Sequence, residues 1–348
     1  MSKMGKLLLI FGITAFVSLM AFCISVAALG VSSENYSVSF FGNKIPFISI
    51  GGEKGIEFRD GETVYRFDSE TGMTYEHTFD ASALYGISIE TASAHTTLTC
   101  SDTDKAYVKY TAGGAALGFS AKMQNGRLTI SEHTSGLFSF GIGNIKSAEL
   151  EISLPEKMYN DVNIAVASGS MKASRLTSDN MSVELASGSL DLNVYAKNIS
   201  FSAASGHGIF TNCTDMAAER IAVHTASGSQ EVYGFRAAET EIGTASGKVT
   251  VSGISGAVDA DVTSGSLYLV YDEWNDDLDI DLTSGKIDVQ LPEGSGIDLD
   301  FERSSGGMSI DLDGTHVSLN KDSSGSYGGS NVHKAEIDVT SGSVAIHN

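Results

Sequence analysis

The chain of 348 residues contains little proline, little cysteine and little positive charge. Its three prolines leave long stretches in which a backbone hydrogen-bond ladder can run without interruption, because proline has no amide N–H to donate. It carries 22 lysine and arginine residues against 43 aspartate and glutamate residues, for a net charge of −21. Nucleic-acid binding depends on clustered lysine and arginine, so this balance argues against a nucleic-acid partner.

Motifs for catalysis and for metal binding are also missing. The nucleophile-elbow pattern Gly-x-Ser-x-Gly does not occur, although the chain is rich in Ser-Gly pairs. The eight histidines are scattered, with no His-x-His or His-Glu-x-x-His spacing. We therefore expect no catalytic residue, no enzymatic activity and no cofactor.

The strongest feature that is present is a Ser-Gly pair, which recurs ten times at spacings of 17 to 22 residues. A fixed period near 19 residues indicates a repeat architecture. The serines of these pairs are Ser168, Ser187, Ser205, Ser227, Ser246, Ser264, Ser284, Ser305, Ser324 and Ser341.

Each Ser-Gly pair separates two runs in which apolar and polar residues alternate. Leu278, Ile280 and Leu282 precede one pair, and Ile287 and Val289 follow it. Alternation at period two predicts β-strands with one apolar face. The pair between them predicts a sharp turn, because glycine accepts positive φ and a serine hydroxyl can bond nearby backbone.

A turn at each repeat predicts an all-β fold, a single-stranded β-helix or β-solenoid whose coils of about 19 residues stack about 4.8 Å apart. The alternative is an antiparallel meander or a sandwich of hairpins. Hairpin turns prefer Asn-Gly or Asp-Gly pairs, whereas this chain uses Ser-Gly. The pattern therefore favours the solenoid.

The N-terminal segment, residues 1–31, differs from the rest of the chain in composition. Lys3 and Lys6 precede 25 uncharged residues, 7–31, which as a helix would span about 37 Å. The basic residues before this run and Glu34 after it predict a single-pass transmembrane anchor with a cytoplasmic N-terminus and an extracytoplasmic solenoid. The alternative is a signal peptide cleaved near Ala27, which would release a secreted protein.

Residues 32–80 have a less regular pattern and are predicted to form a lead-in or stalk. The solenoid is predicted for residues 81–348 as one domain, with Gly-rich excursions at 113–119 and 135–143. Cys100 and Cys213 would lie about six coils apart in such a rod, beyond the reach of a disulfide, so we expect both thiols to be free.

Acidic residues gather in two neighbouring repeats. Asp277, Asp279 and Asp281 precede Asp298 and Asp300 by about one coil, so stacking would bring the two groups together. Carboxylate oxygens are the ligands that Ca²⁺ prefers, which makes these five residues a candidate calcium site. The competing interpretation, which we favour, is a solvated outer strand face, because the EF-hand loop and the Gly-rich calcium nonapeptide are both absent.

Several segments resemble a known bacterial family, the toastrack-type β-solenoid proteins labelled putative adhesins. The resemblance rests on residues 87–98, 128–132 and 150–155 and on the Ser-Gly coils through Ile346, and it covers about residues 81–348. It implies a right-handed β-helix displayed outside the membrane, in a family associated with envelope-stress systems or with adhesion. The family brings no catalytic motif to carry over.

We therefore expect a non-enzymatic binding or scaffold module whose partner is a stress-pathway membrane protein, a cell-surface ligand or a second copy of the chain. One alternative is a polysaccharide-cleaving β-helix enzyme, which would need paired carboxylates or an arginine or lysine base in a groove. Another is a rod that self-assembles through unpaired strand edges, since the last run, residues 344–348, has no obvious cap.

Overall fold

The computed structural model describes residues 72–112, 118–133 and 148–348, together with the backbone of residues 39–40, 43–44, 56–60 and 63–68. All the regular structure in these segments is β-strand. No helix of the described residues is long and apolar enough to cross a membrane, and the predicted anchor, residues 1–31, lies outside them.

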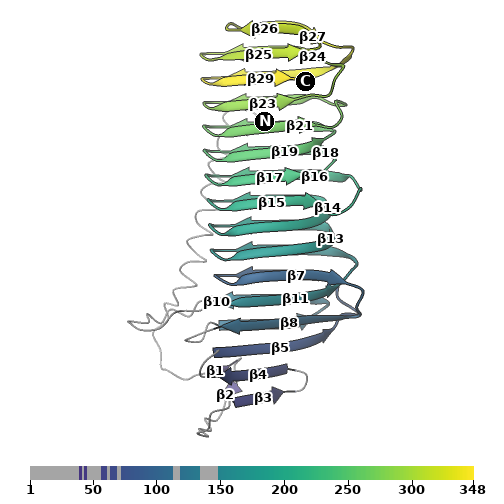
Figure 1. Ribbon diagram of the computed structural model, residues 1–348, viewed down its shortest axis with the longest axis vertical. Helices are drawn as coiled ribbons and strands as arrows, with labels where there is room; N and C mark the ends of the chain where they lie inside the picture. The colour runs from purple at the N-terminus through teal and green to yellow at the C-terminus, as the bar shows by residue number, and fades with distance from the viewer. Residues whose placement is uncertain are drawn as a thin grey trace, which may run out of the picture.

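The strands stack into two ladders that run along a rod, and most coils contribute one strand to each ladder (Figure 1). In ladder one the order in space is β9 (Gly118–Gln124), β10 (Arg127–His133), β6 (Gly86–Thr91), β12 (Met158–Val166), the second halves of β13 (Ser170–Leu185) and β14 (Ser189–Ala203), β16 (Ala218–Thr225), β18 (Ala237–Thr244), β20 (Ala257–Val262), β22 (Leu278–Leu282), β28 (Asn331–Val339), β24 (Ser295–Arg303) and β27 (Ser323–Gly328).

Ladder two contains the other strand of each coil and extends further at the N-terminal end of the rod. Its order in space is β3 (Ile56–Asp60), β4 (Thr63–Asp68), β5 (Gly72–Asp80), β8 (Lys105–Ala112), β11 (Glu149–Pro155), β7 (His95–Ser101), the first halves of β13 and β14, β15 (His207–Asn212), β17 (Ser229–Tyr233), β19 (Lys248–Ile254), β21 (Ser266–Tyr271), β23 (Lys286–Gln290), β29 (Ser343–His347), β25 (Gly307–Leu312) and β26 (Thr315–Leu319). A separate pair is formed by β1 (Ser39–Phe40) and β2 (Asn43–Lys44).

The repeating coils pair in parallel and in direct register. Val223, Ile242, Ala260 and Ile280 form one continuous column across β16, β18, β20 and β22, and all four are buried. The inward residues of the two ladders meet in a single apolar core. The prediction of an all-β fold of stacked alternating strands is confirmed, and parallel pairing rules out a meander of hairpins for the repeats.

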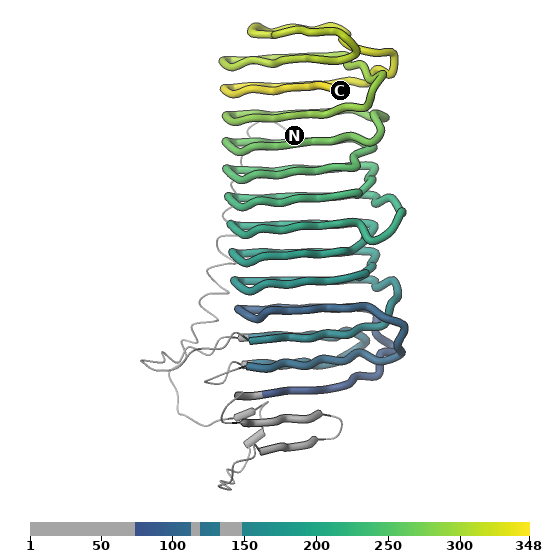
Figure 2. The backbone as a smooth tube through the Cα atoms, viewed as in Figure 1, coloured from purple at the N-terminus to yellow at the C-terminus, as the bar shows by residue number. Residues whose placement is uncertain are grey.

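The order of the coils in space differs from their order in the chain at both ends of the rod. The coil β28–β29 lies between β22–β23 and β24–β25, and the coil β6–β7 lies between β10–β11 and β12–β13 (Figure 2). The expectation that residues 344–348 end the rod without a cap is therefore wrong, because β29 is paired on both sides.

Antiparallel pairs replace the parallel pairing near each end of the rod. At the N-terminal end β9 pairs with β10 and β8 pairs with β11, and at the C-terminal end β27 pairs with β24 and β26 pairs with β25. In the predicted lead-in, 32–80, strands β3, β4 and β5 continue ladder two as an antiparallel meander on β8. The predicted excursions fall largely on residues 113–117 and 134–147, which lie outside the described residues.

Candidate functional site

The Ser-Gly turns stack along one edge of the rod, where six of the serine hydroxyls donate to the neighbouring coil. Ser227 Oγ donates to Ala204 O at 3.1 Å, Ser246 Oγ to Ala226 O at 3.1 Å, and Ser264 Oγ to Ala245 O at 3.0 Å. The same bond recurs at Ser168, Ser187 and Ser205. These serines form a structural ladder, which accounts for their periodicity.

The glycines of these turns have a different role from the predicted one. Among the ten Ser-Gly pairs, only Gly285, Gly306, Gly325 and Gly342 take a positive φ, of 140°, 98°, 150° and 150°. The pair Ser324-Gly325 lies inside β27 (Ser323–Gly328), so the prediction of a turn is wrong at that pair. At Gly188 and Gly228 the need is space, since a Cβ there would lie within 3.0 Å of the carbonyl oxygen of the preceding turn glycine. Close backbone stacking therefore excludes any side chain at these positions.

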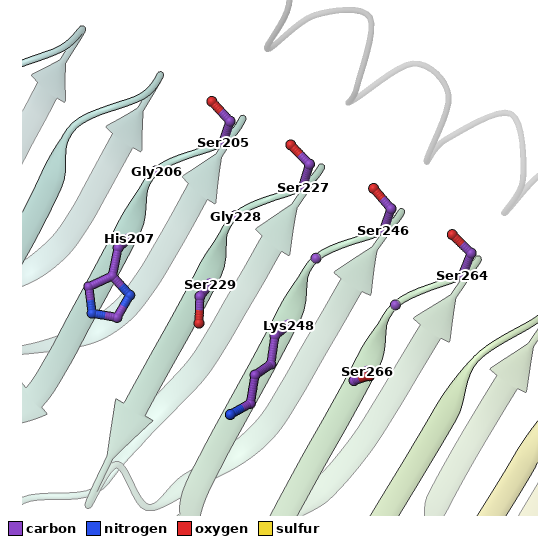
Figure 3. Close-up of a pocket in the computed structure, with 12 residues that line it drawn as sticks. Ser205, Gly206, His207, Ser227, Gly228, Ser229, Ser246, Lys248, Ser264 and Ser266 are labelled. Carbon is purple, nitrogen blue, oxygen red and sulfur yellow. The ribbon is translucent and has the colours of Figure 1, made fainter.

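A shallow open groove of about 540 Å³ runs along four consecutive turns. Glycines form its floor. Figure 3 shows the turn serines Ser205, Ser227, Ser246 and Ser264, which we call the crest serines, on one side and a row of strand residues on the other. That row contains His207, Ser229, Lys248 and Ser266. The groove is polar and shallow, and its crest hydroxyls at Ser205, Ser227, Ser246 and Ser264 already donate to backbone carbonyls.

The outer face of ladder one carries two columns of carboxylates in its C-terminal half. Register pairs place them on successive rungs, which lie about 4.8 Å apart. One column contains Glu241, Asp259, Asp279, Glu336 and Asp300. The other contains Asp261, Asp281, Asp338 and Glu302. We call these nine residues the acidic columns.

The predicted calcium ligands are not brought into contact as the sequence suggested. Coil β28–β29 intervenes, so Glu336 separates Asp279 from Asp300. Asp277 Oδ1 accepts from the Lys334 amide at 3.1 Å, and Asp298 Oδ1 accepts from Ser326 Oγ at 3.4 Å. Within the described part of the chain, no three histidine, cysteine, aspartate or glutamate side chains form a group that could hold a metal ion.

The acidic columns predict a protein whose stability rises with salt. Like charges on adjacent rungs repel, and added salt screens that repulsion. We expect the free energy of unfolding to rise by about 1 kcal/mol between about 0.01 M and about 0.5 M NaCl, measured by urea denaturation.

A double variant, Asp279→Asn with Asp281→Asn, tests the source of this salt effect. It should flatten the salt dependence, because it removes one charge from each column. The matched control is Asp179→Asn, whose carboxylate lies 2.6 Å from Lys197 Nζ, away from the columns. An equal salt response in all three proteins would contradict the assignment.

Comparison with known proteins gives the family. Residues 85–347 match the family model described as Toastrack DUF4097. This chain belongs to the toastrack family. A search of curated proteins gave no match.

Solved structures similar to this toastrack chain share little sequence with it. One is titled a putative adhesin from Parabacteroides distasonis, with 11% identity and a TM-score of 0.48 over 78% of this chain and 96% of that one. Another is titled a putative adhesin from Bacteroides fragilis, with 12% identity and a TM-score of 0.41 over 78% and 96%. A third is titled a putative cell adhesion protein from Clostridium sporogenes, with 14% identity and a TM-score of 0.22 over 79% and 98%.

A buried carboxylate closes the N-terminal end of the toastrack rod. Glu132 is 2% exposed, and its Oε2 accepts from the backbone amides of Ala92, Ser93 and Ala94 at 3.0, 3.1 and 2.9 Å. Its Oε1 accepts from Ser93 Oγ and Tyr110 Oη, both at 3.4 Å. Burial, together with this carboxylate, raises the pKa of Tyr110 far above its usual range.

Glu132 accepts hydrogen bonds from the backbone amides of one turn of the edge. In regular coils the turn amides donate to carbonyls of the previous turn, as Ser168 N does to Ala92 O at 3.0 Å. The amides of turn 92–94 donate to the Glu132 carboxylate instead of to a backbone carbonyl. Glu132 was not predicted from the sequence, although Leu128 and Ile130 place it on the inward, apolar side of its strand. The sequence signal for this role is a carboxylate at a position where the alternating pattern calls for an apolar side chain.

The two described cysteines lie closer together than predicted. Because coil β6–β7 lies directly beside coil β12–β13, Cys100 on β7 and Cys213 after β15 are three rungs apart, not about six. Both thiols are free, as expected. Burial, with the charge of Glu156, raises the pKa of Cys100 to about 12, and burial raises the pKa of Cys213.

The raised pKa values predict slow thiol chemistry in the folded rod. At pH 8 a pKa of about 12 leaves about one thiol in 10⁴ as thiolate, against roughly a quarter for a free cysteine. We expect Cys100 to react with maleimide at least about 100-fold more slowly than in urea, measured by peptide mapping. A rate at pH 8 close to the rate in urea would contradict its burial.

Proposed function

We propose that this protein is a non-enzymatic, membrane-anchored scaffold whose β-solenoid binds a partner outside the cytoplasm, as an adhesin or as a component of an envelope-stress system. The observation that carries the proposal is the in-register rod, whose two ladders present long lateral faces as the surface for contact. Repeat rods present such extended surfaces to partners. We also propose that the coils wind right-handed, as the family resemblance implies.

Charge supports a lateral face as the binding surface. The outer face of ladder one concentrates the acidic columns, whereas the outer face of ladder two mixes residues such as Lys248, Tyr268 and Lys286. Most charges on this face are negative, although Arg220 pairs with Glu241 and Lys334 with Glu336. An excess of one sign favours a partner of the opposite sign and disfavours acidic surfaces. The proposed partner is therefore a membrane protein or cell-surface component that presents basic groups.

In the proposed topology the N-terminal helix, residues 1–31, crosses the membrane once with its N-terminus in the cytoplasm. Ser324→Cys, at an exposed position on β27, tests this. A membrane-impermeant maleimide should label it in intact cells as strongly as in lysed cells. Labelling only after lysis would contradict the topology, and recovery of the protein in the medium would favour signal cleavage.

Site-specific crosslinking tests the binding role. A photoreactive amino acid replaces Asp281 on ladder one, and Thr250 on the outer face of ladder two serves as the matched control. In intact cells we expect the Asp281 position to capture one membrane protein or surface component, with capture that falls as salt rises. Equal, salt-independent capture at both positions, or none at either, would contradict the proposal.

A further inference from the structure

The coil β28–β29 is inserted between two coils that precede it in the chain. On one side Ile337 and Val344 pair in register with Ile280 and Ile287, and on the other side they pair with Phe301 and Met308. The chain therefore completes β22–β23 and β24–β25 first, and the coil that separates them comes afterwards.

The two flanking coils are also complementary to each other. If residues 331–347 were withdrawn, β24 would face β22 with Leu299 opposite Leu278, since both pair with Ala335. On ladder two, Ile310 would face Val289, since both pair with Ile346. The same repeat register would be kept, so a rod without the inserted coil has a second stacking available.

We propose that residues 331–347 form an exchangeable coil, which one copy of this protein donates to the slot between β22–β23 and β24–β25 of a second copy. When β24–β25 stacks directly on β22–β23, residues 331–347 have no slot in their own rod. The open slot of a second copy offers this coil the same register contacts. Exchange of identical elements is a low-cost route to dimers, because it needs no new interface.

The connection into the coil contains a hinge. Gly328, with φ of 86°, ends β27, and only residues 329–330 separate it from β28. Cβ atoms on Gly328 or Gly329 would lie within 3.0 Å of backbone oxygens, so both positions require glycine when the coil occupies the slot of its own rod. Glycines at this link permit the change of backbone direction that donation to another copy needs.

The only tryptophan of the chain lies beside the slot. Trp274 is 1% exposed, its Nε1 donates to Gly296 O on β24 at 2.8 Å, and its carbonyl accepts from Asn331 Nδ2 at 2.6 Å. The His333 ring of the inserted coil lies 5.7 Å from its ring. Withdrawal of the coil removes the Asn331 and His333 contacts, so Trp274 emission reports whether the slot is filled.

Two variants of the full chain, each with one introduced cysteine, test the exchange. Asp279→Cys and Glu336→Cys occupy register partners on β22 and β28, close enough for a disulfide, but each chain carries only one of them. The two variants are unfolded together in urea, refolded at a series of concentrations and oxidised. A 279–336 disulfide then joins two chains only if one copy has donated its coil to the other.

The control pair sits on coils that stack in chain order. Glu241→Cys and Asp259→Cys are register partners on β18 and β20 and lie outside the exchanged segment. We expect the 279–336 link, identified by mass spectrometry, to exceed the 241–259 link at least about tenfold and to increase with concentration, with Trp274 as buried as in the monomer.

A second arm removes the dependence on refolding. The two variants are co-expressed in the same cells and oxidised after purification, and Asp281→Cys with Asp338→Cys repeats the test at the next pair of register partners. Links at 279–336 and 281–338 above the control would support the exchange. Control-level linkage in both arms, or a chain that stays monomeric with only random links, would overturn it.

Discussion

Replacing Glu132 with alanine is expected to lower the free energy of unfolding by about 3–5 kcal/mol. The carboxylate accepts three backbone amides of the turn 92–94 at 2.9–3.1 Å in a site that is 2% exposed. Its removal leaves those amides buried without an acceptor, and each costs about 1–3 kcal/mol. Urea denaturation followed by circular dichroism measures the change.

Two further variants separate this role from a general loss of charge. Glu132→Gln keeps the shape and one acceptor oxygen, so it should lose about half as much stability as the alanine variant. Glu151→Ala removes a carboxylate on β11, in the other ladder, whose side chain is 56% exposed, and it should cost under about 0.5 kcal/mol. Equal losses in Glu132→Ala and Glu151→Ala would show that the buried carboxylate does not cap the turn.

The alternating pattern was enough to predict the strands and their inward faces. Leu278, Ile280 and Leu282 are buried, as their spacing indicates, and the serines after each strand form the hydrogen-bonded edge. When apolar and polar residues alternate and a turn follows at every repeat, few folds other than stacked coils can bury so many apolar residues. The acidic columns also follow from the alternation, because Asp279 and Asp281 fall between the inward residues.

The order of the coils could not be predicted in the same way. Every repeat has the same pattern of inward residues on both sides of a turn, so the pattern does not distinguish β28 from β24 as the neighbour of β22, and the structure pairs β22 with β28. Which neighbour it receives depends on side-chain fit, such as the packing of Trp274 against His333, that the repeat pattern does not contain. The same ambiguity misplaced the predicted calcium ligands and doubled the predicted separation of Cys100 and Cys213.

Replacing Gly228 with alanine is expected to destabilise the rod by about 3 kcal/mol or more. The three atoms nearest to a Cβ at this position would all be backbone atoms of residues 205 and 206, and the nearest is the Gly206 carbonyl oxygen. No side chain can rotate away, so two coils must separate and lose the Ser229 N to Gly206 O hydrogen bond of 3.1 Å. Urea denaturation, followed by circular dichroism and by Trp274 fluorescence, measures the loss.

The matched control is the same substitution one coil further on, at Gly243. An added Cβ there would lie 2.7 Å from His224 Nδ1, a side-chain atom on the outer face, and no closer than 3.5 Å to anything else. That ring can turn aside, so Gly243→Ala should cost under about 1 kcal/mol. Ser227→Ala removes one hydroxyl bond from the same turn as Gly228 and should cost about 0.5–1.5 kcal/mol. If Gly228→Ala were as mild as these two, backbone crowding would not be the reason for glycine at this turn, where φ is not positive.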